Sequence, residues 1–474
     1  MPSTLAGTHD PAVEIKRLDP EVTNRTHGYP GLPRGTNVLV TTGGAVSEAT
    51  VSLLKSAGCT VTVLGIAAAP TTASGCILAA GVAIDREACT RAVEGKAVVV
   101  HAGSPPAAPV EALAEATRNL LDAAAVAGVR GFVYASSASV VFGGQDLKTV
   151  SEDAAPYPRR FADPAAAAIA ESEQAVLDSN AKETGGSSGG GGGSGAMLTC
   201  SIRAASLYGA ETGDEPEERS LLPRLASRAR DGARPIGDGK NVVDFVYAGN
   251  AAHALLLAAE ALLEAPAEAA AVAGRSFFVT DVEPVPFAEF SGRALSRLGY
   301  PAPGGTGGGS AGIPVMLAAV LAFLLRVVAL VVSPVFEFRP ALTALRVAED
   351  STVRRFDTSR ASKDLGYAPL WSQEEALDIS LHAATALRNP RAKLKHIGPF
   401  SAAEVARHSS EDDAWIIVDG KVYDVTPYLE AHPGGDALLR NAGGDSTKGM
   451  HGPQHPASAM EILEQHYIGV LEET

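Results

Sequence analysis

The tetrapeptide His432-Pro433-Gly434-Gly435 decides the interpretation of the C-terminal part of this 474-residue chain, because a second histidine, His455, follows 23 residues after His432. Proline restricts the residue before it to extended or turn conformations. Two glycines then let the chain bend sharply and let its backbone approach a flat ligand closely. Two neutral imidazoles presented in this way can bind iron from opposite faces of a porphyrin. Iron with both axial positions filled by protein favours one-electron transfer.

The residues around this tetrapeptide predict a small sheet with short helices. Trp415 to Val425 reads as two strands around an Asp-Gly turn, and Thr426-Pro427-Tyr428 opens a short helix that leads to His432. Together with Tyr467-Ile468-Gly469 near the end, this order and spacing resemble cytochrome b5 over residues 398–474. The resemblance implies a separate α+β domain that binds one haem b.

The same resemblance implies that His432 and His455 are the axial iron ligands. His451 is a nearby rival for the second position, but the distance back from Tyr467 favours His455. Met450 stands where the family usually has a phenylalanine against the haem, and methionine fills apolar gaps well.

Charge and cysteine content narrow the function classes. The net charge of −15 argues against a nucleic-acid partner. Residues 399–474 carry 13 acidic and 4 basic side chains, a net of −9, which suits docking of the haem domain to a basic redox partner. Solubility alone is the plainer explanation of that acidity. Four cysteines without metal-like spacing fit a reducing compartment.

Residues 36–135 alternate apolar strands with helical stretches. Strands are expected at 36–40, 61–64, 97–102 and 131–135, with helices near 47–57, 86–94 and 109–127. This alternation predicts an α/β domain with a doubly wound, Rossmann-like parallel sheet covered by helices on both faces.

Two further segments carry a family resemblance. Tyr134 to Gly143 is similar to the extended short-chain dehydrogenases, and Gly237 to Tyr247 narrows the resemblance to the 3β-hydroxysteroid dehydrogenase branch, which includes the decarboxylating sterol-4α-carboxylate 3-dehydrogenases. The resemblance covers residues 36–385. It implies a smaller substrate domain, NAD(P) as cofactor and oxidation of a sterol 3-hydroxyl.

The nucleotide-binding positions depart from that family. Its three glycines fall on Thr41, Gly44 and Ser47, or on Gly43, Val46 and Ala49 if the alignment starts two residues later, so only Gly43 and Gly44 remain as candidate cofactor-binding residues. The ribose-binding acid is replaced by Gly65. The adenine-contacting Asp is replaced by Val82, although Asp85 follows.

The catalytic positions also depart. The family's tyrosine, whose proton transfer depends on a lysine four residues later, falls on Ala165, and that lysine falls on Ile169. Tyr157 does not replace the pair, because Phe161 stands four residues after it. Of the catalytic groups, Ser137, the family's hydroxyl-polarising serine, remains.

The most apolar stretch is 313–335, within which residues 315–332 contain Arg326 as the only charge. Eighteen apolar residues lie at the lower edge of a membrane span. A spanning helix, a helix lying in the membrane interface and a buried hairpin are all open. We favour interfacial attachment to the cytosolic face of the endoplasmic reticulum membrane, because Phe356 to Tyr367 should return to the same fold.

These observations predict a flexible tail (1–35), a dehydrogenase-like domain (36–384) with glycine-rich loops at 185–195 and 304–309, a basic linker (385–397) and a haem domain (398–474). The first hypothesis is an electron-transfer protein that links a reductase to a sterol-modifying oxygenase or desaturase, with a degenerate dehydrogenase site. The alternatives are an active NAD(P)-dependent 3β-hydroxysteroid dehydrogenase and a non-catalytic sterol-binding scaffold.

Overall fold

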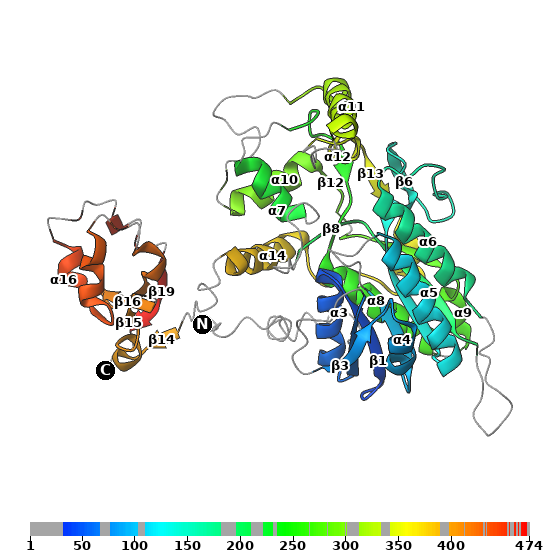
Figure 1. Ribbon diagram of the computed structural model, residues 1–474, viewed down its shortest axis with the longest axis horizontal. Coiled ribbons are helices and arrows are strands. Elements are labelled where there is room, and N and C mark those ends of the chain that lie inside the picture. The colour runs from blue at the N-terminus through cyan, green and yellow to red at the C-terminus, as the bar shows by residue number, and fades with distance from the viewer. Residues whose placement is uncertain are drawn as a thin grey trace. The chain divides into compact units, whose positions relative to one another are not determined.

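A computed structural model shows how the chain folds. Residues 14–385 form one compact unit, and residues 386–474 belong to a second (Figure 1). The structure describes residues 32–66, 76–102, 110–181, 196–209, 221–230, 235–264, 266–281, 283–298, 300, 312–332, 342–388, 398–411 and most of 413–471. The glycine-rich loops expected at 185–195 and 304–309 lie outside the described residues.

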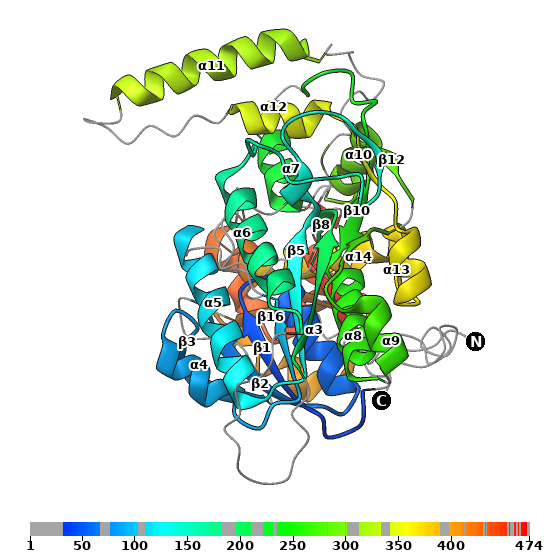
Figure 2. The same ribbon diagram turned by 90° about the vertical axis from the view of Figure 1, so that its right-hand side faces the viewer.

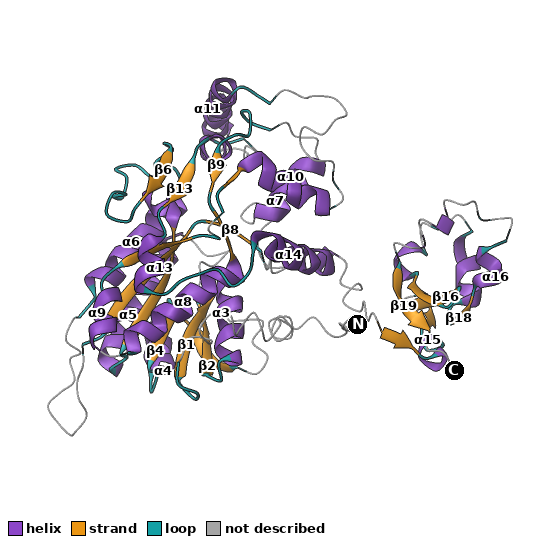
Figure 3. Cartoon of the chain, turned by 180° about the vertical axis from the view of Figure 1, so that it is seen from behind, coloured by secondary structure: helices purple, strands orange, loops and turns teal. Residues whose placement is uncertain are grey.

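A seven-stranded parallel sheet forms the centre of the larger unit (Figure 3). Its order is β11-β7-β5-β4-β1-β2-β3, with strands built from apolar runs that are buried on both faces near the middle. The strands are β1 (Asn37–Thr42), β2 (Thr60–Gly65), β3 (Ile77–Val82), β4 (Val98–His101), β5 (Gly131–Ser137), β7 (Leu198–Ala204) and β11 (Ser276–Val279). The strand order reverses between β1 and β4, where ligands bind in doubly wound folds.

Helices cover both faces of this sheet (Figure 2). One face is covered by α3 (Ala45–Ser56) and α8 (Ala248–Leu263), and the other by α4 (Arg86–Val93), α5 (Val110–Ala127) and α6 (Pro164–Asp178). The predicted Rossmann-like doubly wound architecture is therefore confirmed. Strand β3 was missed by the sequence analysis, because its edge position leaves most of its side chains exposed.

The expected boundaries need two corrections. Residues 32–35 do not belong to a loose tail, because Leu32 is buried in the main core and the Gly35 amide donates to the carbonyl of Gly58 at 2.9 Å. Helix α14 (Gln373–Arg388) extends into the stretch expected as the basic linker, so residues 385–388 are helical.

A smaller subdomain is built from segments distant in sequence. Strands β12 (Val285–Pro286), β9 (Val242–Val243), β13 (Arg354–Phe356) and β6 (Leu147–Val150) form one sheet in that order, and β8 (Ser206–Tyr208) pairs with β10 (Phe245–Tyr247). Besides α14, the larger unit also contains the helices α7 (Leu221–Arg230), α9 (Pro266–Val272), α10 (Phe287–Arg297), α12 (Ala344–Ser351) and α13 (Ser359–Asp364). The pairing of β13 with β6 confirms that the chain returns to this fold after the apolar stretch.

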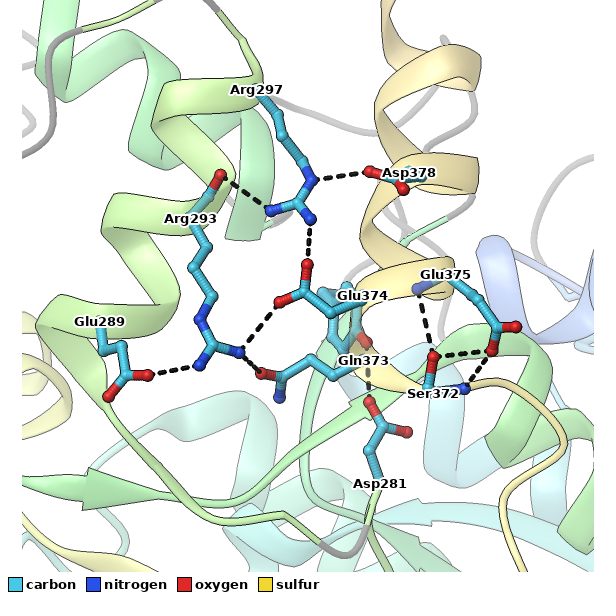
Figure 4. Close-up of polar contacts among 10 residues, drawn as sticks. Asp281, Glu289, Arg293, Arg297, Ser372, Gln373, Glu374, Glu375 and Asp378 are labelled. Atoms are coloured by element: carbon cyan, nitrogen blue, oxygen red, sulfur yellow. Dashed lines mark hydrogen bonds and ion pairs between the residues drawn. The ribbon is translucent and has the colours of Figure 1, made fainter.

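A surface network of ion pairs joins α10 to α14 (Figure 4). Arg293 pairs with Glu374 at 3.1 Å, and Arg297 pairs with both Glu374 and Asp378. Nearby, the buried carboxylate of Asp281 accepts the hydroxyl of Tyr208 at 2.7 Å.

The apolar stretch forms α11 (Val315–Val332). Among the α11 side chains that the structure describes, Ala318 and Ala322 alone are buried, and they belong to one cluster with Ile236 and Val347. Among the described residues, no helix is long and apolar enough to cross a membrane.

The C-terminal unit is a small α+β fold, as predicted. Its sheet runs β14 (Gly398–Phe400), β19 (Tyr467–Leu471), β17 (Lys421–Asp424), β16 (Asp413–Val418) and β15 (Ser409–Ser410), and β18 (Gly444–Asp445) also pairs with β16. Short helical turns lie at α15 (Ala402–Val405), η3 (Thr426–Tyr428), η4 (Gly435–Asn441) and α16 (Thr447–Met450). The Asp-Gly turn is confirmed at Asp419 and Gly420, whose φ angles of 51° and 75° match the favoured hairpin geometry.

Candidate haem centre and dehydrogenase-like cavity

Alternation along β16 separates two apolar clusters in the C-terminal unit. Trp415 and Ile417 point into a cluster with Phe400 and Ile468, whereas Ile416 and Val418 point into the opposite one. The second cluster is joined by Leu429, Leu438, Leu439, Ala442, Met450, Met460 and Leu463. Met450 therefore contributes apolar surface to this cluster, as expected for a residue beside a porphyrin.

The structure brings the rings of His432 and His455 together. Their ring centroids lie 6.2 Å apart, with an angle of 42° between the ring planes. A metal–imidazole bond of about 2 Å, with the ring centre roughly 1 Å behind the nitrogen, gives a spacing of about 6 Å when a metal lies between two imidazoles. The two rings therefore have the separation that an iron porphyrin needs.

Hydrogen bonds distinguish the two candidates for the second ligand, His455 and His451. Nδ1 of His455 lies 3.0 Å from the carbonyl oxygen of Gly449, so Nδ1 carries the proton and Nε2 keeps its lone pair for a metal. The rival His451 instead places its Nε2 2.8 Å from a carboxylate oxygen of Asp419 at the surface. His432 is positioned by the turn after Tyr428, whose ring meets the imidazole edge-on at 5.8 Å.

The positions that align with the family's nucleotide-binding glycines lie where β1 leads into α3. Gly44 adopts a φ of 107°, which glycine tolerates and side chains do not. The hydroxyl of Ser47 accepts the Gly43 amide at 3.1 Å and donates to the Gly44 carbonyl at 2.7 Å. The Gly43 amide, which in this position would face a pyrophosphate, is therefore already hydrogen-bonded inside the protein.

The other nucleotide positions offer no replacement. Gly65 ends β2 without a side chain that could accept a ribose hydroxyl. Asp85 caps α4 by accepting the Glu87 amide at 2.9 Å, so its carboxylate serves the helix. Beneath the β1–α3 junction, His101 is fully buried between the hydroxyls of Thr41 and Thr117, at 2.7 and 2.9 Å. Burial lowers the pKa of His101 to about 3, so the ring is neutral.

The catalytic positions lie along β5 and α6. Ser137 ends β5, where its Oγ accepts the amide and hydroxyl of Ser139 at 3.1 and 2.9 Å. Ala165 and Ile169 lie in the first part of α6. Methyl and sec-butyl groups at these positions cannot exchange a proton with an alcohol.

The hydroxyl of Tyr157 is hydrogen-bonded within a buried ion pair. Its hydroxyl donates to Glu173 at 2.8 Å, and Glu173 forms a buried ion pair with Arg203 at 3.0 Å. Burial and the Glu173 carboxylate raise the pKa of Tyr157 well above its usual value, which opposes formation of a phenolate.

A cavity of about 240 Å³ opens beside Ser137. Its apolar wall includes Phe142, Phe245, Phe287 and Phe356. Its polar wall includes Ser137, Ser139, Asp163, Arg224, Glu349 and Arg354. The sequence did not single out Arg224 or Arg354; the local signal was the position of Arg354 just before the segment Phe356 to Tyr367, which was expected to return to this fold.

Comparison with known proteins agrees with this arrangement. Residues 74–306 match the 3-beta hydroxysteroid dehydrogenase/isomerase family. The chain is 34% identical to the mouse sterol-4-alpha-carboxylate 3-dehydrogenase, decarboxylating, over 63% of this chain and 77% of the relative. The chain belongs to this family. The human protein of the same name is 32% identical over 63% of this chain and 74% of its own length.

The family domain is followed by a second match, because residues 401–472 match the cytochrome b5-like heme/steroid binding domain. This confirms the predicted fusion of a dehydrogenase-family domain with a cytochrome b5 domain. An Arabidopsis thaliana 3beta-hydroxysteroid-dehydrogenase/decarboxylase, isoform 2, is 31% identical over 68% of this chain, which spans about half (54%) of that protein.

Solved structures support the fold of the dehydrogenase-family domain. The Thermotoga maritima UDP-glucose 4-epimerase has a TM-score of 0.53 and 18% identity, covering 75% of this chain and 100% of that one. A dTDP-glucose 4,6-dehydratase mutant from Streptomyces venezuelae, solved with NAD, has a TM-score of 0.51 and 19% identity, covering 75% and 98%. These neighbours share the sheet and its helical layers with this chain.

Proposed function

We propose that this protein transfers electrons through a haem in its cytochrome b5 domain, while its dehydrogenase-family domain binds a sterol without hydride transfer. The observation that carries the proposal is a contrast between the two sites. His432 and His455 face each other at 6.2 Å, whereas Ala165 and Ile169 replace the proton-transferring pair.

The haem would supply one-electron chemistry. His432 and His455 would hold it, and the Gly449 carbonyl would keep the His455 tautomer that presents Nε2. The net charge of −9 over residues 399–474 supports docking to a basic reductase or to a sterol-modifying oxygenase or desaturase. Such docking weakens as salt screens the charges.

Loss of nucleotide binding is the second part of the proposal. Ser47 bonds the Gly43 amide, and Gly65 supplies no carboxylate for the ribose. The residues present thus fit NAD(P) poorly, and we assign no step of the reaction to it.

Two measurements on the full chain test these parts separately. A reduced-minus-oxidised visible spectrum should show a six-coordinate haem. Isothermal titration with NAD⁺, NADH, NADP⁺ and NADPH should show no binding. Measurable turnover of a 3β-hydroxysterol with either nicotinamide would contradict the non-catalytic assignment.

An active NAD(P)-dependent dehydrogenase is the second candidate, because Ser137 faces the cavity and the relatives are sterol dehydrogenases. The rebuilt variant Ala165→Tyr/Ile169→Lys/Ser47→Gly distinguishes the two. If the natural chain is inactive through these positions, the triple variant gains nucleotide binding. If the natural chain already oxidises a sterol, Ala165, Ile169 and Ser47 do not mark the positions on which its catalysis depends. A sterol-binding scaffold remains the assignment if the chain shows no haem spectrum.

Attachment to the cytosolic face of the endoplasmic reticulum membrane is a further part of the proposal, supported by α11. Ala318, Ala322, Leu325 and Ala329 form a single stripe that is buried or half-buried. At about 100° per residue, the exposed side chains cover the remaining ~240° of the helix, with Met316 82% and Phe323 64% exposed. An apolar surface of this width suits a helix immersed in the membrane interface while its buried stripe packs on the protein. Arg326, at the edge of the stripe, can extend to headgroups.

Alkaline carbonate extraction tests this attachment. The variant Phe323→Glu/Leu324→Glu should release the protein from membranes. Val126→Glu is the matched control, because Val126 is 74% exposed on α5, away from α11. Full release of the unaltered protein would reject membrane attachment.

A further inference from the structure

Helix α12 packs against the apolar helix α11 at one end of the larger unit (Figure 2). Val347 of α12 belongs to one apolar cluster with Ala318 and Ala322 of α11. The axes of packed helices lie about 8–10 Å apart, and each headgroup layer of a bilayer is about 5–8 Å thick. With α11 in the membrane interface, as proposed above, α12 and its side chains therefore reach the layer of lipid headgroups.

Another side of α12 carries ion pairs to α7. Glu349 pairs with Arg224 at 3.1 Å, and Asp350 pairs with Arg228 at 2.6 Å. Arg346 stands one turn before Asp350, so its side chain projects from the same side of α12. Burial lowers the pKa of Arg346, and the positive charge of Arg228 lowers it further. Three guanidinium groups therefore lie close to one another around two carboxylates.

The three helices carry an excess of positive charge. Helices α7, α11 and α12 contain five arginines and two acidic residues, a net charge of +3, whereas the whole chain has a net charge of −15. The arginines are Arg224, Arg228, Arg230, Arg326 and Arg346. Basic residues beside an exposed apolar helix are typical of surfaces that bind anionic membranes. The charge around α11 is thus opposite in sign to that of the chain as a whole.

We propose that Arg326 and Arg346 bind the phosphates of anionic phospholipid headgroups in the membrane that α11 contacts. This inference rests on the proposed membrane attachment and names the class of lipid. Arg326 is exposed and Arg346 is half-buried, and guanidinium groups form short, charge-assisted hydrogen bonds with phosphate, often in parallel pairs. A phosphate beside Arg346 would also offset its repulsion by Arg228. Acidic residues more than a Debye length away, about 8 Å at physiological salt, oppose this attraction little.

Vesicle binding by the full, haem-loaded chain tests the proposal. Flotation would compare vesicles of phosphatidylcholine with vesicles of phosphatidylcholine mixed with phosphatidylserine. We expect roughly 5- to 50-fold tighter binding to the anionic vesicles, because each basic residue near an anionic surface adds attraction. The preference should shrink in high salt, since salt screens the arginines. Inorganic phosphate, added against a chloride control of equal ionic strength, should not displace the protein.

Variants locate that preference. Arg326→Gln/Arg346→Gln should reduce it roughly 10-fold, and Arg326→Lys/Arg346→Lys, which keeps both charges, should retain most of it. Arg86→Gln is the matched control, because Arg86 is exposed on α4, at the opposite end of the unit from α11. Circular dichroism and the haem absorption band show whether each variant is folded. The single variant Arg326→Gln, at an exposed position, serves if the double variant does not fold.

The outcomes separate this inference from the proposed attachment. Equal binding to both kinds of vesicle, an unchanged preference in a folded Arg326→Gln/Arg346→Gln variant, or displacement by inorganic phosphate would overturn headgroup binding while leaving membrane attachment intact. Failure to bind either kind of vesicle would overturn attachment through α11, and the headgroup site with it. Phe323→Ser/Leu324→Ser should weaken binding to both kinds of vesicle and keep the ratio between them, because it removes apolar surface without changing charge.

Discussion

His455 in the cytochrome b5 domain and His101 in the dehydrogenase-family domain are both held by hydrogen bonds, but with different consequences. His455 uses Nδ1 on the Gly449 carbonyl, which leaves Nε2 with its lone pair, and its ring centre lies 6.2 Å from that of His432. His101 uses both nitrogens on Thr41 and Thr117 and has no exposed surface. An imidazole with one hydrogen-bonded nitrogen can still bind a metal through the other nitrogen, whereas an imidazole with both nitrogens hydrogen-bonded serves only as a structural group.

The same contrast extends to the two sites as wholes. In the cytochrome b5 domain, the ring centres of the two candidate ligands, His432 and His455, lie 6.2 Å apart. In the dehydrogenase-family domain, Ser47 bonds the Gly43 amide, and Glu173 holds Tyr157. The Gly43 amide and the Tyr157 hydroxyl are therefore already bonded inside the protein.

The strongest test of this contrast removes a ligand. His432→Ala or His455→Ala should abolish the spectrum of six-coordinate haem, because one axial position loses its nitrogen. The measurement is the reduced-minus-oxidised spectrum of the full chain. His451→Ala is the matched control and should leave the spectrum intact; loss of haem in that variant alone would make His451 the ligand.

A second test breaks the buried pair of the other domain. Glu173→Gln should destabilise the dehydrogenase-family domain by about 3–5 kcal/mol, because it leaves Arg203 buried without a carboxylate. Glu171→Gln, on the same helix, removes an exposed partner of Arg118 and should cost about 0–1 kcal/mol. Urea unfolding followed by circular dichroism measures both, with the haem band as a report on the other domain. Equal effects would contradict the structural role assigned to Glu173.

A third test uses the pH dependence of stability. The pKa of His101 is lowered to about 3 by burial, so the unfolded chain binds its proton first as pH falls below about 6.5. The stability from neutral His101 is therefore present above pH 6.5 and lost on acidification toward pH 3. Relative to His101→Gln, the natural domain should lose about 2–3 kcal/mol between pH 6.5 and 4.

Other buried groups do not disturb this difference. Burial raises the pKa values of Asp244 and Asp281 to about 6, which gives the opposite pH dependence, but both remain in the natural chain and in the variant. Parallel stability curves for the two proteins would show that His101 is not buried neutral.

The smallest expected effect concerns the surface network of α10 and α14 (Figure 4). Arg297→Met should cost less than about 1 kcal/mol, because its partners are half-exposed and screened by water. The loss should shrink further in high salt. Thermal unfolding at low and high ionic strength measures it, and a cost like that of Glu173→Gln would contradict the distinction between surface and buried pairs.

Much of the fold follows from local patterns. The buried strands near the middle of the sheet were predicted because their side chains are apolar on both faces, as in Val98–His101. The edge strand Ile77–Val82 was missed because its exposed, alanine- and glycine-containing sequence lacks that signal. His432 was proposed as a haem ligand because proline and glycines mark the turn around it. The cavity was not, since Ser137, Arg224 and Arg354 come from widely separated segments.

The sequence alone specifies which chemical groups stand at each position: two histidines 23 residues apart, and alanine and isoleucine at the positions that we align with the family's tyrosine and lysine. Only the tertiary structure decided how those groups are used. It placed His455 against His432, bonded Ser47 to Gly43, and left Arg354 without an ion-pair partner among the described residues. The physical reason is that burial and hydrogen-bond partners depend on contacts between segments far apart in the chain, whereas composition and turn chemistry are local.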